Sequence, residues 1–159
     1  MKNSINKRLI VGVILVAAVA FGSLAYSHCQ IPCGIYGDEA RFEAMAEHVT
    51  TIEKSMREIE RLSAETNPNM NQVVRWVNNK ELHAGELSKI ITDYFMAQRI
   101  KLPAEGDAKA RNDYVRKLTL LHRMLVTAMK AKQTTDLSNV QQLRSLLDEF
   151  HGVYSGKAR

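Results

Sequence analysis

Apolar residues recur every three or four positions through most of the chain, a pattern typical of amphipathic helices. Between Asp38 and Ala64 the apolar positions form one heptad-like stripe: Phe42, Met45, Val49, Ile52, Met56, Ile59 and Leu62. The polar run at 66–69 ends this helix, and a second helix is predicted to start near Pro68. Its inward positions are predicted to be Val73, Val77, Leu87, Ile90, Ile91, Tyr94 and Phe95.

Two further helices follow the turn signal at 103–106. The third is predicted over about 108–132, with apolar Tyr114, Leu118, Leu121, Leu125 and Ala128. Residues 134–136 supply capping side chains, and the fourth helix extends to Tyr154. The sequence contains no sustained strand-like alternation, Gly-rich phosphate loop or internal repeat. The pattern therefore predicts an all-α, up-down four-helix bundle.

The first 27 residues have the organisation of a secretory signal peptide. A basic start precedes an apolar stretch, 9–20, that is too short to span a membrane comfortably. Small residues at Ala25 and Ser27 predict cleavage by signal peptidase between Ser27 and His28. The alternative is an uncleaved membrane anchor. We therefore expect a signal peptide at 1–27, a short N-terminal segment at 28–36, called the hook below, and a helical domain at 37–159.

Cleavage changes the charge of the chain. It leaves 132 of the 159 residues and removes Lys2, Lys7 and Arg8, so the net charge falls from +5 to +2. This balance is too weak to indicate a nucleic-acid partner, and it would not repel a small anion. The mature protein is expected in the periplasm or outside the cell, without a stable membrane anchor.

Both cysteines of the chain lie in the hook, at Cys29 and Cys33. After cleavage, His28 offers an amine and an imidazole, and Cys29 offers its sulfur and its backbone nitrogen. The turn-prone sequence 32–34 allows Cys33 to bring a second sulfur to the same ion. Planar coordination rich in nitrogen favours Ni(II) or Cu(II) over tetrahedral Zn. The hook is therefore interpreted as a metal site suited to one-electron redox chemistry.

A disulfide between Cys29 and Cys33 is the plain alternative in an exported protein. It would close a small loop and leave the adjacent His28 and cleavage site as coincidence, so the metal site is favoured. The other histidines show no metal-ligand spacing and are expected at a surface or an interface: His48, His83, His122 and His151.

The motif H-C-x-x-P-C-G-x-Y at 28–36, followed by a four-helix body, resembles nickel-containing superoxide dismutase. A looser likeness continues through 40–44 and 93–95. The resemblance implies conversion of superoxide to dioxygen and hydrogen peroxide by Ni(II)/Ni(III) cycling, with one nickel ion per subunit of a homohexamer.

The resemblance also implies roles for individual residues. His28, Cys29 and Cys33 would be the nickel ligands, and the His28 imidazole would be the axial one. Catalytic Tyr36 would stand over the open axial face. Three other residues would support the site: Pro32 by bending the hook, Glu43 by orienting the imidazole of a neighbouring subunit, and Tyr94 as an outer tyrosine. Without the resemblance, Tyr94 is a core residue and Glu43 a solvated acid in the first part of a helix.

The chain departs from the family pattern at a few positions. Gln30 replaces a common acid, the spacer at 37–39 is one residue shorter, and no clear match exists for an arginine that supports the glutamate. Lys80 lies in the corresponding region. Two other functions stay open: an exported nickel or copper binding protein without turnover, and a membrane-tethered helical protein with a fortuitous hook.

Overall fold

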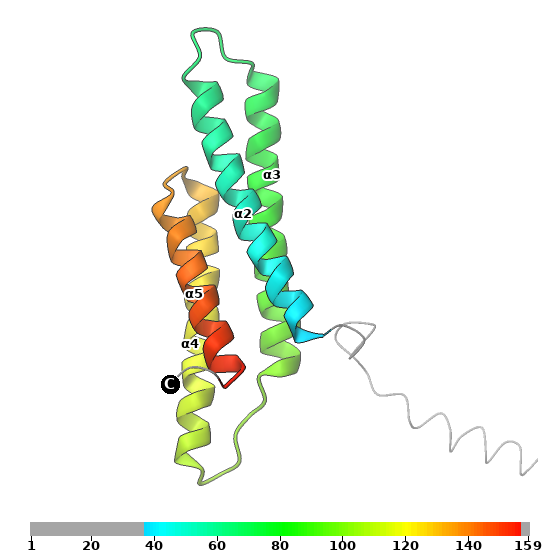
Figure 1. The fold of residues 1–159 in the computed structure, drawn as a ribbon, viewed down its shortest axis with the longest axis vertical. Helices are drawn as coiled ribbons and strands as arrows, with labels where there is room; N and C mark the ends of the chain where they lie inside the picture. Colours follow the sequence, from blue (N-terminus) through cyan, green and yellow to red (C-terminus); the bar gives the residue numbers. More distant parts are fainter. Residues whose placement is uncertain (1–36, 157–159) are drawn as a thin grey trace, which may run out of the picture. The chain divides into compact units, whose positions relative to one another are not determined.

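The computed structural model describes residues 37–156, and this part of the chain is built from helices without any strand. Figure 1 shows the helices α2 (Asp38–Ser63), α3 (Met70–Lys89), η1 (Ile90–Arg99), α4 (Ala108–Gln133) and α5 (Ser138–Tyr154). Because η1 continues α3 without a break, four rods result. The predicted all-α fold is confirmed.

Consecutive rods run in opposite directions, so the topology is up-down-up-down (Figure 1). Contacts join α2 to α3, α3 to α4, α4 to α5 and α5 back to α2, which closes the bundle. The hook at 28–36 lies outside the described residues. No described helix is both long and apolar enough to cross a membrane.

Side chains at the predicted breaks define where the helices begin. The Asn69 side chain accepts a hydrogen bond from the backbone N–H of Gln72 at 3.2 Å, and α3 starts at the next residue. The Asp107 side chain accepts from the Ala110 N–H at 2.8 Å at the start of α4. Gly106 precedes it with φ +85°, a conformation that favours glycine. These contacts satisfy N–H groups that have no partner inside the helix.

An aromatic cluster fills the core where α2, η1 and α5 meet. The Phe95 ring centroid lies 4.9 Å from that of Phe42 and 5.0 Å from that of Phe150, and all three side chains are buried. Tyr154 packs on the same cluster, with its ring centroid 5.5 Å from that of Phe95. Tilted and edge-on ring contacts add to the apolar area that these side chains remove from water.

Part of the α4 pattern packs differently from the expected stripe. Leu118 and Leu125 are only half-buried, whereas the buried apolar residues of α4 are Leu120, Leu121, Met124, Ala128 and Ala131. Several stripes of similar spacing coexist on α4, and contacts with α3 and α5 decide which one turns inward.

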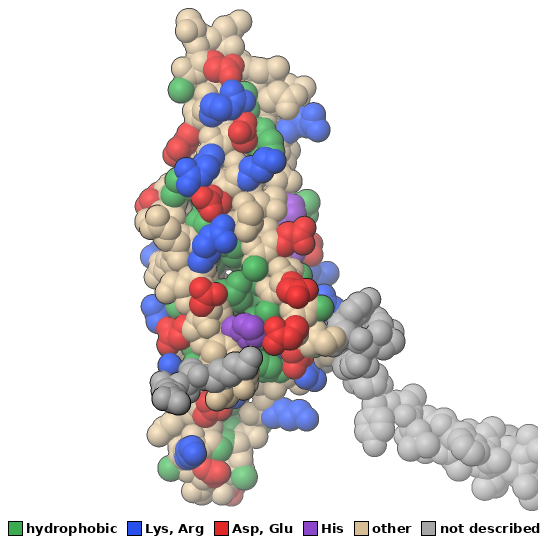
Figure 2. Space-filling model, viewed as in Figure 1, with side chains coloured by type: hydrophobic (Ala, Val, Ile, Leu, Met, Phe, Trp, Pro, Cys, Tyr) green, Lys and Arg blue, Asp and Glu red, His purple; other side chains and the backbone are tan. Residues whose placement is uncertain are grey.

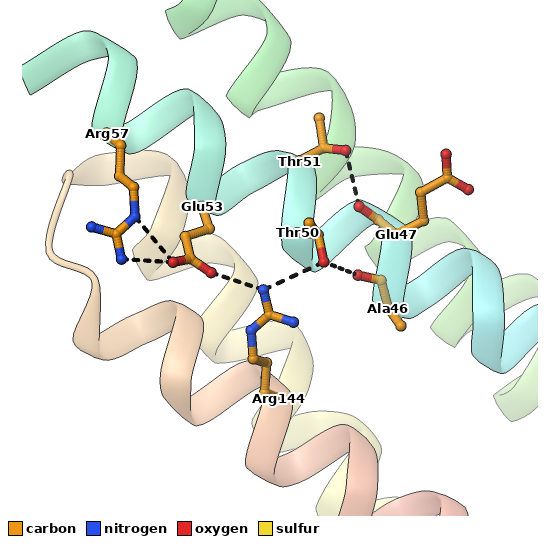
Figure 3. A network of polar contacts seen from close by, with 7 residues as sticks. All are labelled: Ala46, Glu47, Thr50, Thr51, Glu53, Arg57 and Arg144. Carbon is orange, nitrogen blue, oxygen red and sulfur yellow. Dashed lines mark hydrogen bonds and ion pairs between the residues drawn. The ribbon is translucent and has the colours of Figure 1, made fainter. Parts of the chain in front are cut away.

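An ionic network joins α2 to α5 at the surface (Figure 3). Arg144 of α5 donates to Glu53 of α2 at 2.8 Å, and Arg57 donates to the other Glu53 oxygen at 2.7 Å. These two hydrogen bonds lower the pKa of Glu53. Figure 2 shows acidic and basic side chains interspersed on this face of the molecule, without a broad patch of one sign.

The predicted second helix changes its hydrogen-bond pattern near its end. The ten residues of η1 form a π-helix, in which N–H groups bond to carbonyls five residues earlier. The last such bond runs from the Ile100 N–H to the Phe95 carbonyl at 2.9 Å. Hydrophobic periodicity did not predict the π-helical conformation, because the spacing of its inward residues, including Tyr94 and Phe95, also suits an α-helix.

Lys80 of α3 is buried and holds the end of α4. Its ammonium donates to the Lys132 carbonyl and, at 3.2 Å, to the Thr134 carbonyl. Burial lowers the pKa of Lys80. A cation at this position also interacts favourably with the negative end of the helix dipole. The ammonium group is therefore engaged at the end of α4, and its role in this part of the structure is to stabilise that helix.

Replacement of Lys80 by Met is expected to destabilise the bundle by about 1–3 kcal/mol, because two carbonyls lose their donor. Chemical denaturation of the two proteins measures the difference. Lys89→Met, an exposed position in the same helix, is the matched control and is expected to change the free energy of unfolding by less than about 0.5 kcal/mol. Equal stability of the Lys80→Met variant and the parent protein would contradict this role.

Candidate metal centre

Five of the predicted site residues lie outside the described residues: His28, Cys29, Pro32, Cys33 and Tyr36. Their chemistry can still be tested against nickel. Thiolates suit soft and borderline metals, and amine, amide and imidazole nitrogens suit late first-row ions in planar geometry. His28, Cys29 and Cys33 offer the imidazole, the amide and the two thiolates, and cleavage before His28 would add the amine, so this donor set fits nickel. Within 37–156, no group of three or more histidine, cysteine, aspartate or glutamate side chains could hold a metal ion.

The described structure begins directly after the hook with a dense polar contact. Asp38, the first residue of α2, accepts hydrogen bonds from the Tyr94 hydroxyl at 2.6 Å and the Tyr154 hydroxyl at 2.8 Å. Arg99 donates to the same carboxylate at 2.6 Å and pairs with it ionically. Asp38, Tyr94, Arg99 and Tyr154 are called the Asp38 corner below. The corner ties the start of α2 to η1 and α5.

The protonation states in the Asp38 corner are well separated. Partial burial acts to raise the pKa of Asp38, but hydrogen bonds from Arg99, Tyr94 and Tyr154 outweigh it and leave that pKa below its usual value. Burial and the hydrogen bond to Asp38 raise the pKa of Tyr94 to about 12. The pKa of Tyr154 is raised for the same two reasons. At neutral pH the carboxylate is therefore charged and both phenols keep their protons.

Tyr94 belongs both to the core and to this polar corner. Its side chain is buried, and its ring meets the Phe95 ring edge-on at a centroid distance of 5.2 Å. The guanidinium carbons of Arg41 and Arg99 lie 5.1 Å and 5.8 Å from the centre of the Tyr94 ring. Cations over an aromatic face are attracted by its negative potential. The two arginines therefore hold the ring while Asp38 holds its hydroxyl.

Glu43, the other supporting residue within the described part, is exposed on α2. It lies one turn beyond Glu39, whose carboxylate is 3.0 Å from Nε2 of His151. The His151 ring also stacks on Phe42 at a centroid distance of 4.2 Å. The structure thus places Tyr94 inside the Asp38 corner and Glu43 on the outer surface of the same end of α2.

Sequence patterns predict no functional role for three residues of the Asp38 corner: Asp38, Arg99 and Tyr154. The sequence patterns mark Asp38 only as the start of a helix and Tyr154 only as the end of one. The spacing of five between Tyr94 and Arg99 is natural in a π-helix and lacks the usual three- or four-residue signal of an α-helical face. The position of Asp38, two residues after the hook motif, was the one available signal.

Comparison with known proteins identifies the family of this chain. A family model described as nickel-containing superoxide dismutase matches residues 23–157, a range that includes both the hook and the four-helix body. No curated protein and no solved structure matches the chain. The match extends over far more than half of the sequence and agrees with the donor chemistry of the hook. The chain therefore belongs to the nickel-containing superoxide dismutase family, whose members are oxidoreductases that use a nickel cofactor.

Proposed function

We propose that the chain dismutates superoxide with nickel held at an N-terminus created by cleavage before His28. Two superoxide anions and two protons give dioxygen and hydrogen peroxide. The observation that carries the proposal is the location of the cysteines. The sequence has two, Cys29 and Cys33, and both lie in the hook, inside the range matched by the family model.

The residues of the hook would divide the work of holding the metal. The His28 amine, the Cys29 backbone nitrogen and the Cys29 sulfur would form fused chelate rings, and Cys33 would add the second sulfur. When bound there, nickel supplies one-electron exchange between Ni(II) and Ni(III). The His28 imidazole would be a further ligand, and Tyr36 would stand beside the metal site and restrict access to small molecules.

Positioning of the hook would depend on the start of α2. Asp38 lies two residues after Tyr36 in the sequence. Its carboxylate accepts hydrogen bonds from three donors at 2.6–2.8 Å, so α2, η1 and α5 meet at this residue. A fixed helix start limits the conformations that the attached hook can sample, which lowers the entropy lost when ligands assemble. Because the pKa of Tyr94 is about 12, its hydroxyl is a hydrogen-bond donor to Asp38 and a poor proton source at neutral pH.

Glu43 would orient the His28 imidazole of a neighbouring subunit in a homohexamer. Its exposure on α2 is compatible with that role, and an imidazole fixed by a carboxylate keeps the ring orientation that ligation needs. Large apolar side chains also remain exposed on the helices, including Met70, Val74 and Leu82 of α3 and Met129 of α4. Faces of this kind are candidates for burial between subunits.

Export would supply the processed N-terminus. Signal peptidase would cut between Ser27 and His28, and the mature enzyme would act in the periplasm or outside the cell. The two steps are linked, because an uncut chain has an amide where the amine ligand is required. A nickel binding protein without turnover is the alternative that the first experiment below separates from the enzyme.

Cys29→Ser and Cys33→Ser are each expected to reduce nickel-dependent superoxide consumption to background, because a hydroxyl cannot replace a thiolate in stabilising Ni(III). Stopped-flow decay of superoxide, with protein that begins at His28 and with or without one equivalent of nickel, measures this. Unchanged helix content and thermal unfolding serve as the control. Turnover retained in either variant would refute the ligand assignment. Tight nickel binding by the parent protein without turnover would support the binding protein instead.

One alanine placed before His28 is expected to abolish activity and to weaken nickel binding, because the amine ligand becomes an amide. The same assay and a nickel titration measure both effects. One alanine added after Arg159 is the matched control and should leave activity unchanged. Full activity with the N-terminal extension would rule out the processed end as a ligand.

Asp38→Asn is expected to lower the free energy of unfolding by about 1–3 kcal/mol near neutral pH, because charge-assisted hydrogen bonds are lost. The pKa of Asp38 is depressed in the folded state, so its stabilisation is present above its ordinary value of 3.8 and is lost as the pH falls through the folded value. Denaturation between pH 3 and 7 should therefore show the difference shrinking at the acid end.

Asp148→Asn, an exposed acid on α5, is the matched control for the loss of one negative charge. We also expect Asp38→Asn to lower activity at unchanged nickel content. Normal activity together with reduced stability would mean that the Asp38 corner stabilises the bundle without positioning the hook.

A further inference from the structure

Two histidines face each other between α2 and α3. Neither belongs to the hook or to the Asp38 corner. Nδ1 of His48 lies 2.9 Å from Nδ1 of His83, and the ring centroids are 5.1 Å apart with their planes inclined by 55°. Both residues are half-buried, so each keeps some contact with solvent. At this distance one ring donates an N–H to the other, which requires at least one neutral ring.

The separation of the two nitrogens also matches that of two ligands on one metal ion. Metal–imidazole bonds are about 2.0–2.1 Å long, so two ligands at a right angle lie ~2.9 Å apart, and two at a tetrahedral angle ~3.3 Å apart. The pair therefore has the spacing of neighbouring positions in a planar or octahedral site. Rotation of the rings would aim both lone pairs at one ion while the helices keep their separation.

The surroundings favour a cation. Among the nearby charged groups, Glu86 of α3 and Glu47 of α2 both act electrostatically on His48. Burial, and then the proximity of His83, nevertheless lower the pKa of His48. The neutral imidazole, which binds metals, is thus maintained at neutral pH. The ring that donates through Nδ1 would move its proton to its own Nε2, so no proton needs to leave the pair.

We propose that His48 and His83 form a second, weaker site for a divalent late first-row ion, Ni²⁺ or Cu²⁺, with water completing the coordination. Two imidazoles without thiolate or amine ligands predict micromolar affinity, with Cu²⁺ bound more tightly than Ni²⁺. The ion would link α2 to α3. Nickel content would then exceed one ion per chain when nickel is in excess.

This site escapes a search for ligand spacing in the sequence, because its two histidines are 35 residues apart and meet only when α2 packs on α3. Trp76, the single tryptophan, offers a local probe. It lies seven residues before His83 on α3, which is two turns or ~10.5 Å along the helix. A paramagnetic ion at the pair is expected to quench its fluorescence.

The test titrates Ni²⁺ into the mature chain after one equivalent has been bound, with calorimetry and Trp76 fluorescence as readouts. The parent protein should show a second, micromolar binding step and quenching. His48→Gln and His83→Gln should each weaken that step at least tenfold. His122→Gln, which removes an exposed histidine of α4, is the matched control and should titrate like the parent.

An unchanged second step in both pair variants would overturn the proposal, as would an equal loss in His122→Gln. The metal-free variants are first compared with the parent by thermal unfolding. If both fail to fold, the parent protein alone decides: the proposal requires nickel in excess of one equivalent to raise its Tm and to quench Trp76. The absence of either effect would overturn it. Loss of the first, tight binding step in His48→Gln or His83→Gln would instead count against the hook as the tight nickel site.

Discussion

Burial of the aromatic cluster is the interaction on which the arrangement of the helices around Asp38 depends. Phe42, Phe95 and Phe150 come from three different rods, and their rings can be removed from water only if α2, η1 and α5 converge. That convergence brings Tyr94 and Tyr154 beside Asp38. The polar contacts of the Asp38 corner are then protected at the edge of an apolar core, where hydrogen bonds to a charged group are stronger than in open solvent.

Electrostatics at this end differ from those of the α2–α5 surface. Glu53 and Arg144 lie on a face with interspersed charges, where an exposed ion pair contributes little because water and salt screen it. Asp38 instead combines one guanidinium with two phenols that stay protonated through the neutral range. Its contribution depends more on hydrogen-bond geometry than on long-range charge.

The helices could be predicted from the sequence because each has a local signal. The three- and four-residue spacing of the apolar positions between Phe42 and Leu62 indicates a helix, and a capping side chain such as Asp107 marks where a helix starts. The hook motif is equally local, because its proposed ligands lie within six residues, and their role as ligands stays a prediction. Lys80, the Asp38 corner and the His48–His83 pair could not be predicted, because each joins side chains that are distant in sequence. Lys80 lies in the region that corresponds to the supporting arginine of the family, and its ammonium bonds carbonyls at the end of α4.

The π-helix η1 gives this part of the chain a constraint on length that a loop does not have. Its bonding pattern accommodates extra backbone within a helix while keeping Phe95 in the core and Tyr94 and Arg99 on the Asp38 side. A residue added to the segment at 64–69 can be absorbed by the turn between α2 and α3. A residue removed between Tyr94 and Arg99 would rotate Arg99 about the helix axis relative to Tyr94 and separate the guanidinium from the phenol. The number of residues in η1 therefore determines whether the Asp38 corner can form, although η1 lies more than fifty residues from Asp38 in the sequence.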